Sequence, residues 1–212
     1  MFTKTLSGKA QKSLAVLGKN NLLPKGTYMA GGSALALHFG HRLSVDFDFF
    51  TPFSFSSSGL KGELKKVGVF KYRKALSDTL LGTFNNVQFS MFYYNYPLLF
   101  PTSKFLGIEI ADSKEIGAMK IAAVMDRGSK KDFIDLYFLS QNGISLEECF
   151  ANYDKKYKVL ENNLYSIITS LSYFVDAENS EMPVMLEKVN WQEIKKFFEK
   201  EAVRLGKKYL EK

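Results

Sequence analysis

The sequence predicts an α+β fold in which a region of alternating helices and strands is followed by a purely helical region. Helix and strand patterns alternate over about residues 1–111, and from Asp112 onward the periodic segments have helical spacing only. The chain has 212 residues, 46% of them hydrophobic, which is enough to bury a sizeable core. We therefore expect an α/β core over residues 1–111 and a helical region over residues 112–212.

The first half of the α/β region predicts strand, helix, strand and helix in turn. Residues 27–30 predict a short strand, which a Gly-Gly pair ends, and residues 33–39 predict a helix with a serine near its start. Residues 45–50 alternate apolar and polar side chains, as a half-buried strand does. A serine-rich loop at residues 54–59 precedes a short basic helix at residues 60–67.

The second half of the α/β region predicts a run of strands at residues 69–75, 79–84 and 87–94. Two asparagines separate the last two of these strands and form a good hairpin turn, because asparagine tolerates positive φ. Residues 106–110 predict one more strand after a proline-containing segment.

The helical region starts with a pattern that resembles a capping box, Asp112 followed by Glu115. The first helix is expected to run to about Arg127, where Gly128 ends it, and a second helix to cover residues 131–141. Further helices, which we expect to form a C-terminal bundle, are predicted at residues 145–157, 159–176 and 191–210.

The chain carries an excess of positive charge, with 29 Lys and Arg against 22 Asp and Glu and a net charge of +7. The excess is clustered: five lysines and no acid within residues 1–30, six basic residues and one acid within residues 61–74, and eight basic against four acidic residues within residues 188–212. Such clusters suit a polyanion such as RNA or a nucleotide, although solvated helix faces also explain them.

The single cysteine, Cys149, excludes a disulfide bond within the chain and fits a reducing cytoplasm. No apolar run approaches the roughly 18 residues of a membrane helix, and the N-terminal segment lacks the apolar stretch of a signal peptide. We therefore expect a cytoplasmic protein with no membrane partner.

Two carboxylates fall on one face of the strand at residues 45–50. Successive side chains of a strand point to opposite faces, so Asp46 and Asp48 lie together, roughly 7 Å apart at Cα. Both can reach one hard cation, and Mg²⁺ takes carboxylate and phosphate oxygens. The alternative is a solvent-facing strand with two unremarkable acids.

A Gly-Gly-Ser sequence precedes these acids, at residues 31–33. Two glycines between a strand and a helix let the backbone approach a ligand, and the start of the helix offers free N–H groups to an anion. An ordinary tight turn would explain the same residues. Together with the acids, however, the pattern predicts a phosphate cradle beside a metal site.

On these residues the chain resembles the DNA-polymerase-β-like nucleotidyltransferases and, within them, the AbiEii type of bacterial toxin–antitoxin and phage-defence proteins. The first motif of the family, a Gly-Gly/Ser turn followed by Asp-x-Asp, maps onto Gly31, Gly32, Ser33, Asp46 and Asp48. Arg42 and Ser44 fit the Arg-x-Ser-x-Asp pattern of the subfamily. A later block of a helical lysine, an arginine and a Lys-Asp-x-x-Asp stretch maps onto Lys120, Arg127, Lys131, Asp132 and Asp135. The resemblance covers about residues 28–142.

The later block also has a physical interpretation. On a helix from residue 112, Lys120 and Arg127 share a largely apolar stripe, where a lysine needs an anion. A triphosphate could lie across them, or Lys120 could pair with a structural carboxylate. The apolar helix that follows carries Asp132 and Asp135 one turn apart, and these acids either orient Lys120 or Arg127, take part in catalysis, or form structural ion pairs.

The resemblance implies a polymerase-β-like core with a mixed sheet and the transfer of a nucleoside monophosphate from an NTP to an acceptor hydroxyl. It implies Mg²⁺ or Mn²⁺ on Asp46 and Asp48, with Lys120, Asp132 and Asp135 as further catalytic residues. The nucleotide would contact Gly31, Gly32, Ser33, Arg42, Ser44, Lys120, Arg127 and Lys131. An RNA acceptor such as tRNA, a cognate antitoxin and a role in phage defence are also implied.

The chain departs from many relatives of this superfamily, because the strand at residues 87–94 has Gln88 and Ser90 where a third carboxylate is common. The general base would then be Asp48 or one of the later aspartates. Two alternatives stay open. One is a non-catalytic module that binds a nucleotide, RNA or an antitoxin, and the other is a nucleotidyltransferase that modifies a small molecule such as an antibiotic.

Overall fold

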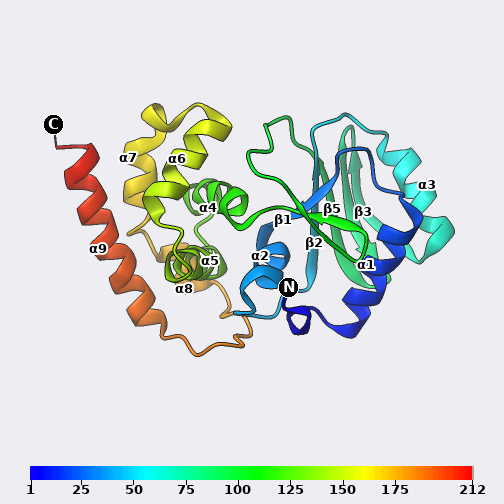
Figure 1. The fold of residues 1–212 in the computed structure, drawn as a ribbon, viewed down its shortest axis with the longest axis horizontal. Coiled ribbons are helices and arrows are strands. Elements are labelled where there is room, and N and C mark those ends of the chain that lie inside the picture. Colours follow the sequence, from blue (N-terminus) through cyan, green and yellow to red (C-terminus); the bar gives the residue numbers. More distant parts are fainter. Residues whose placement is uncertain (212) are drawn as a thin grey trace. The chain divides into compact units, whose positions relative to one another are not determined.

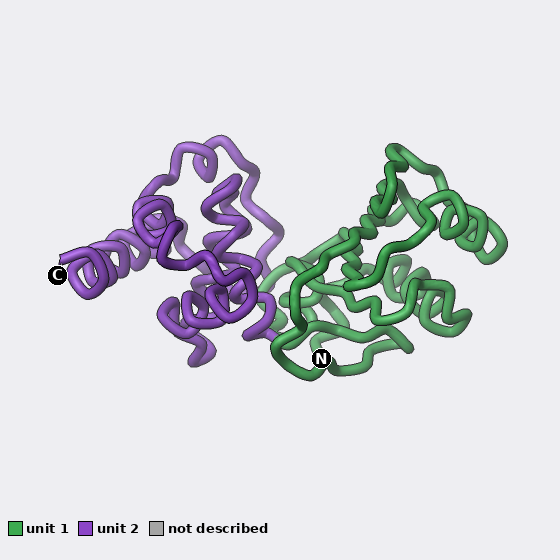
Figure 2. Tube along the Cα trace, turned by 90° about the horizontal axis from the view of Figure 1, so that it is seen from above, with its two compact units in different colours: residues 1–112 green, residues 113–212 purple. Residues whose placement is uncertain are grey.

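The structure is a computed structural model that describes residues 1–211. The chain divides into two compact units, Met1–Asp112 and Ser113–Lys212 (Figure 2). Within residues 1–211 no helix combines the length and the apolar character that crossing a membrane requires.

The first unit is built on a mixed β-sheet (Figure 1). Its strands are β1 (Tyr28–Ala30), β2 (Asp46–Thr51), β3 (Phe70–Leu76), β4 (Thr79–Phe84), β5 (Val87–Tyr93), β6 (Ser103–Phe105) and β7 (Ile108–Ile110). Their order across the sheet is β3-β4-β5-β2-β1-β7-β6. Strand β2 pairs parallel with β5 and antiparallel with β1, and β1 pairs parallel with β7. The mixed sheet predicted from the sequence is therefore confirmed.

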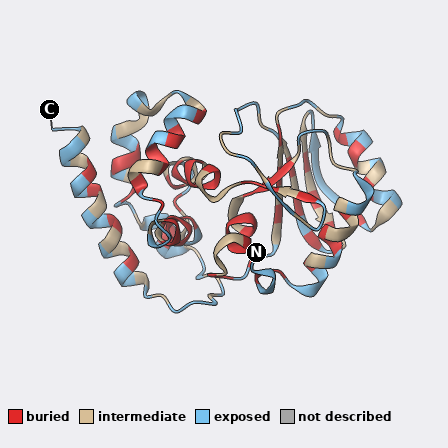
Figure 3. Ribbon diagram, viewed as in Figure 1, coloured by how far each residue is buried: buried red, intermediate tan, exposed pale blue. Residues whose placement is uncertain are grey.

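The helices of the first unit are η1 (Thr3–Thr5), α1 (Gly8–Asn20), α2 (Gly31–Phe39) and α3 (Ser57–Val67). Figure 1 shows α1 and α3 on the same side of the sheet. Alternate residues of β2, β4 and β5 are buried, among them Phe47, Phe49 and Phe89, which are at most 1% exposed. The residues between them are half-buried or exposed (Figure 3), so the sheet has one fully covered face and one more open face.

Three elements of the first unit were not predicted, namely the short η1, helix α1 and strand β6. Helix α1 carries apolar residues at Ala10, Leu14 and Leu17, and Ser7 caps its start by accepting a hydrogen bond from the N–H of Ala10. Strand β6 forms a hairpin with β7 through a turn in which Leu106 and Gly107 both have positive φ. None of the three residues of β6 is buried, so the strand lacks the apolar alternation that predicts a half-buried strand.

Helix boundaries were wrong at two other places. Residues 57–59 were predicted as a loop but belong to α3, because the hydroxyl of Ser56 accepts from the N–H of Gly59 and caps the helix. Helix α2 begins at Gly31 and not at Ser33. The hairpin turn at Asn85 and Asn86 is confirmed, since both residues have positive φ.

The second unit is helical, as predicted. Its helices are α4 (Ser113–Asp126), α5 (Lys130–Gln141), α6 (Leu146–Tyr157), α7 (Leu160–Ser170), α8 (Val175–Asn179) and α9 (Trp191–Tyr209). Phe133 of α5 lies at the centre of an aromatic cluster with Phe174, Trp191 and Phe198. This cluster joins α5 to α9 and to the segment that leads into α8.

The single helix predicted over residues 159–176 is wrong, because the chain forms α7 and α8 with a break between them. The hydroxyl of Thr169 donates to the carbonyls of Tyr165 and Ser166, and that of Ser172 donates to the carbonyl of Thr169. Serine and threonine side chains that bind the backbone in this way compete with helix continuation.

Candidate active site

Two carboxylates lie side by side on the open face of β2. Phe47 and Phe49 enter the core, and Asp46 and Asp48 lie half-buried on the opposite face, as the alternation predicted. The strand is central in the sheet, so its position is held from both sides by β1 and β5. A rigid strand is a suitable support for two metal ligands.

The start of α2 lies against the second of these acids. Strand β1 ends at Ala30, which is paired with Asp48, and the helix begins at the next residue. Gly31 has a φ of 71°, and a Cβ at this position would lie 3.1 Å from Asp48 Oδ2. The positive φ and the close approach both require glycine here. Ala30, at the N-cap of α2, makes no side-chain capping bond. Because Ala30 is the strand partner of Asp48, the predicted phosphate cradle lies next to the predicted metal ligands.

Arg42 packs beneath the same turn. It is 4% exposed, and a Cβ at Gly32 would overlap its Nη2. Its Nη1 donates to the carbonyl of Leu43 at 3.2 Å and to the hydroxyl of Ser44 at 3.4 Å. The structure therefore holds a guanidinium in place directly below the glycines, where its positive charge favours an anion at the helix start.

The hydroxyl groups of Ser33 and Ser44 connect α2 to the start of β2. Ser33 donates to the backbone carbonyl of Asp46 and lies 2.8 Å from the hydroxyl of Ser44. Both serines are buried. These bonds position the strand that carries the acids, whereas a direct contact of either hydroxyl with a nucleotide stays a prediction.

The neighbouring strand β5 brings uncharged side chains to the acids. In the parallel register Gln88 is the partner of Asp46, and Ser90 is the partner of Asp48. Within residues 1–211 no group of three or more His, Cys, Asp and Glu side chains is arranged to hold a metal ion. A cation on β2 would therefore take two carboxylates from this face and its other ligands from elsewhere.

The later sequence block forms a second cluster, within the helical unit. Lys120 of α4 is 4% exposed and pairs with Asp132 Oδ1 at 2.8 Å and with Asp135 Oδ2 at 2.6 Å. Arg127 binds Asp132 with Nε at 2.9 Å and with Nη2 at 3.0 Å. The sequence left open whether Lys120 pairs with a carboxylate or binds a phosphate. The structure shows Lys120 and Arg127 in ion pairs with these aspartates.

Ser129 completes this cluster and was not singled out in the sequence. Its hydroxyl donates to Asp132 Oδ2 at 2.5 Å. A serine three residues before an aspartate at a helix start indicates a capping box, but Ser129 makes no side-chain capping bond here, so the pattern marks the residue and not its contact. Asp132 thus accepts bonds from Lys120, Arg127 and Ser129.

The charge of Asp132 is stabilised by this environment. Burial by itself would raise the pKa of Asp132, but the charges and hydrogen bonds of Lys120 and Arg127 more than offset it and hold the pKa well below its usual value. Asp132 is therefore a poor proton acceptor near neutral pH, and an orienting role suits it better than that of a base.

The predicted residues thus gather in two groups, each inside one unit. The first contains Gly31, Gly32, Ser33, Arg42, Ser44, Asp46 and Asp48, and the second contains Lys120, Arg127, Asp132 and Asp135. Lys131 is exposed on α5. The adjacent Lys130 donates from Nζ to the carbonyl of Ser180 at 3.0 Å and lies over the ring of Trp191. The catalytic and nucleotide-binding roles of all these residues stay predictions.

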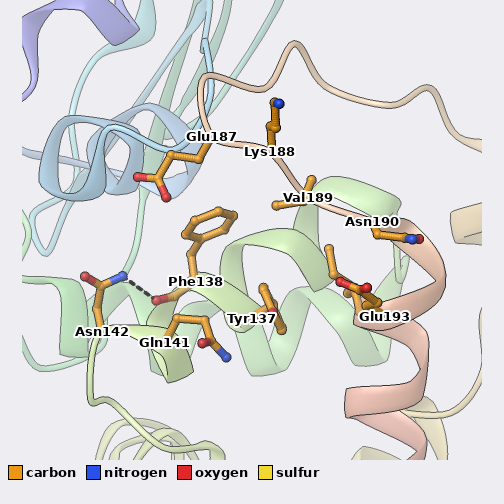
Figure 4. Close-up of a pocket in the computed structure, with 10 residues that line it drawn as sticks. Tyr137, Phe138, Gln141, Asn142, Glu187, Lys188, Val189, Asn190 and Glu193 are labelled. Atoms are coloured by element: carbon orange, nitrogen blue, oxygen red, sulfur yellow. Dashed lines mark hydrogen bonds between the residues drawn. The ribbon is translucent and has the colours of Figure 1, made fainter.

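A cavity of about 350 Å³ lies in the second unit (Figure 4). It is formed by the end of α5, where Asn142 donates to the carbonyl of Phe138, and by the chain that leads into α9, including Glu187 and Glu193. None of the predicted site residues lines it. The candidate active site therefore stays on β2 and the start of α2.

A family model and a relative at substantial identity match this chain. The model described as "Nucleotidyl transferase AbiEii toxin, Type IV TA system" matches residues 17–100 and 93–206. The chain is 40% identical over 191 residues to a protein of Aquifex aeolicus (strain VF5) that is named "Uncharacterized protein aq_aa25". That match covers 87% of this chain and 88% of the relative.

Solved structures share the fold. The nucleotidyltransferase toxin MenT4 of Mycobacterium tuberculosis H37Rv aligns with a TM-score of 0.60 at 15% identity, covering 93% of this chain and 82% of MenT4. JHP933 of Helicobacter pylori aligns with a TM-score of 0.57 at 19% identity, covering 97% and 95%. A putative nucleotidyltransferase from H. pylori aligns with a TM-score of 0.54 at 17% identity, covering 97% and 98%. At these identities the alignments establish the fold alone.

Proposed function

This chain belongs to the family of nucleotidyl transferase AbiEii toxins of type IV toxin–antitoxin systems, and we propose that it is a Mg²⁺-dependent transferase of nucleoside monophosphates to RNA. The observation that carries the proposal is the position of Asp46 and Asp48 on the open face of β2, directly beside the glycine-rich start of α2. Phosphoryl chemistry needs metal ligands and a phosphate cradle as neighbours.

The residues present fit a magnesium ion. Asp46 and Asp48 offer hard oxygen ligands from one rigid strand and are half-buried, so both remain accessible. Mg²⁺ is commonly held by one or two carboxylates and keeps water and phosphate oxygens as its other ligands. When bound, the ion would polarise the phosphate oxygens and neutralise part of their charge. Mn²⁺ would satisfy the same ligands.

The chain's own residues would bind and orient the nucleotide. The N–H groups at residues 31–33 would receive the triphosphate, and Arg42 below the glycines would add positive charge. An acceptor hydroxyl oxygen would bond to the α-phosphorus, the bond from that phosphorus to the bridging oxygen would break, and pyrophosphate would leave. The hydroxyl proton would pass to Asp48, which lies beside the glycine-rich start of α2.

We propose an RNA such as tRNA as the acceptor, since the net charge of +7 favours a polyanion. We also propose that a cognate antitoxin controls the activity, that the pair acts in phage defence and that it works in the cytoplasm, where NTP and RNA are found. The description of the family as type IV toxin–antitoxin supports the antitoxin.

One observation favours a second candidate. Since β5 places Gln88 and Ser90 beside the acids, the site has no third carboxylate on that strand. A module that binds a nucleotide or RNA without turnover would have the same residues.

The experiment that separates these functions uses purified protein with Mg²⁺, each α-³²P-labelled NTP in turn, and total RNA. The test variant is Asp46→Asn/Asp48→Asn, and the control is Asp126→Asn/Asp176→Asn, which removes two exposed acids from the helical unit. Label on a discrete RNA band with wild type and control, but not with the test variant, supports the transferase. Thermal melting of all three proteins excludes unfolding as the cause.

Other outcomes are equally informative. If no RNA is labelled but a small acceptor such as an aminoglycoside is, the RNA part of the proposal fails. If the wild type binds NTP and labels no acceptor, the non-catalytic module replaces the transferase. Equal labelling by the wild type and the test variant would refute the role of the two aspartates.

A further inference from the structure

The edge of the sheet farthest from β6 carries a dense set of basic side chains. Strand β3 is the edge strand, and α3 packs on β3 and β4. Every residue from Lys71 to Leu76 is exposed. The basic residues of the two elements are Lys61, Lys65, Lys66, Lys71, Arg73 and Lys74. Of these, Lys66 pairs with Glu63, and Lys61 lies over the ring of Tyr72.

The strand register places two of these lysines on the face that carries the acids. Residues that are direct partners in neighbouring strands point to the same side of a sheet. One row runs from Asp46 through Gln88 and Thr83 to Lys71, and the next row runs from Asp48 through Ser90 and Leu81 to Lys74. Each row therefore ends in one of the two aspartates on β2 and in a lysine on β3.

A β-bulge makes this arrangement possible. Lys71 and Lys74 are three residues apart, so in a regular strand they would point to opposite faces. The register shifts between Tyr72 and Lys74, where Arg73 is the extra residue, and this shift returns Lys74 to the face of Lys71. Lysines on an edge strand can also prevent pairing with other chains, but that role does not depend on the face to which they point. It therefore does not explain why both lysines lie on the face of the acids.

The spacing suits an extended polyanion. Three strand-to-strand steps separate β3 from β2, which corresponds to about 14 Å at about 4.8 Å a step. The partners of Lys71 and Lys74 on β4, Thr83 and Leu81, lie two residues apart, or about 7 Å along the strand. That distance is about the rise of two nucleotides in a stacked strand.

The four residues that lie between the lysines and the acids in these rows carry no charge. They are Gln88, Ser90, Thr83 and Leu81, and none of them repels a phosphate backbone. Helix α2 follows β1, on the opposite side of β2 from β5 and β3. A triphosphate bound at the start of α2 therefore lies away from Lys71 and Lys74, and these lysines are available to a different ligand.

We infer that Lys71 and Lys74 bind backbone phosphates of the acceptor RNA, which lies across β3, β4 and β5 with its reactive hydroxyl toward Asp46 and Asp48. The inference rests on the proposed function, since it takes the acids on β2 as the reaction centre. Contacts with phosphates are independent of base sequence, so this surface contributes affinity and orientation and does not select the RNA.

The test is a binding measurement without NTP, so that it does not depend on turnover. The variant is Lys71→Gln/Lys74→Gln, and the matched control is Lys9→Gln/Lys12→Gln, which removes the same charge from exposed positions on α1. The fluorescence anisotropy of a labelled oligouridylate is recorded with each protein over a series of salt concentrations. Both variants change exposed side chains only, and thermal melting confirms that they fold.

The test variant is expected to bind the oligouridylate about tenfold more weakly than the wild type. The slope of log K against log salt should fall by about 1.4, the value for two phosphate contacts on a single strand. The control should keep the wild-type slope. In turnover, the KM for RNA should rise and the KM for NTP should not change.

Equal affinities and slopes for the two variants would overturn the inference, and so would a wild type that does not bind the oligouridylate. The same experiments distinguish a failure of this inference from a failure of the proposed transferase. If the wild type binds RNA through Lys71 and Lys74 but transfers no label to any acceptor, the RNA-binding surface stands and the reaction does not. If the protein instead labels a small molecule and does not bind RNA, the transfer reaction stands and the RNA-binding surface is refuted.

Discussion

The guanidinium group of Arg42 packs against the α-carbon of Gly32, so a methyl group at position 32 would overlap Nη2. Arg42 is buried and bonded to Leu43 and Ser44, so it cannot move aside without losing these bonds. We expect Gly32→Ala to lower stability by about 1–3 kcal/mol, as other overpacked sites do, and to weaken NTP binding. Urea unfolding and equilibrium binding of ATP measure the two effects.

The control for this substitution is Gly62→Ala on α3. A Cβ at Gly62 meets nothing within 4 Å, and alanine is favoured over glycine inside a helix, so the free energy of unfolding should rise by about 0.5–1 kcal/mol. The two Gly→Ala changes should therefore have opposite signs. The same sign for both would contradict the packing described for Arg42.

A carboxylate introduced at Ser90 is expected to strengthen metal binding. Ser90 is the direct partner of Asp48, so the new group would lie about 5 Å away on the same face of the sheet. We expect Ser90→Asp to lower the Kd for Mn²⁺ about tenfold, which corresponds to about 1.4 kcal/mol. Electron paramagnetic resonance of free Mn²⁺ during a titration measures this Kd.

The matched control for Ser90→Asp is Thr83→Asp. Thr83 lies on the same face, but one strand farther from β2, as the partner of Gln88. It adds the same charge about 10 Å from Asp46, at two strand spacings, and should change the Kd by less than about twofold. An equal effect of the two substitutions would mean that overall charge, and not a ligand on β5, governs the affinity.

The strands and most helices could be predicted because their signals are local. The alternation at residues 45–50 places Asp46 and Asp48 together without any knowledge of the fold. Helix α1 had a readable pattern at Ala10, Leu14 and Leu17, but the glycines and lysines among its other residues obscured it. The break between α7 and α8 depends on which hydroxyls bind the backbone, and composition does not reveal that choice.

The contacts inside the candidate site were less predictable, because they depend on packing between elements. Both the apolar stripe of α4 and the acids of α5 indicated a partner for Lys120, yet a phosphate and a carboxylate were equally compatible with the pattern. Similarly, the sequence could not show that Ser33 binds the carbonyl of Asp46, since that bond forms only when α2 packs on β2.

Asp132 is expected to make stability depend on pH. Its pKa in the folded protein lies below the value of about 3.9 in an unfolded chain. Its contribution to stability is therefore fully present above the unfolded pKa and is lost as the pH falls through it toward the folded pKa. Asp132→Asn should cost about 3 kcal/mol at pH 7, and the difference from the wild type should shrink below about pH 4.

Urea unfolding at a series of pH values from neutral to acidic tests this prediction. The control is Asp126→Asn, which removes an exposed acid from the end of α4. It should shift the free energy of unfolding by less than about 0.5 kcal/mol, as surface substitutions usually do. A difference between Asp132→Asn and the wild type that stays constant down to acid pH would contradict the assigned role of the carboxylate.

The buried ion pair of Glu115 and Lys156 is expected to be strongly coupled, so that the helical unit loses stability when either partner is removed alone. It joins α4 to α6 at 2.5 Å, and neither side chain is exposed to solvent. Removing one partner leaves the other charge buried, so Glu115→Leu and Lys156→Met should each cost about 3–5 kcal/mol. The double variant Glu115→Leu/Lys156→Met buries no charge and should be close to the wild type in stability.

A double-mutant cycle in urea measures the coupling directly, and the exposed pair of Glu63 and Lys66 on α3 is the control. The side chain of Lys66 is 68% exposed and that of Glu63 is 46% exposed, so their coupling should be only about 0.2–1 kcal/mol. If the buried pair coupled no more strongly than this exposed one, water would have to reach Lys156. If the destabilisation of the double variant equalled the sum of the two single effects, the side chains of Glu115 and Lys156 would contribute independently, and the coupling expected for this ion pair would be refuted.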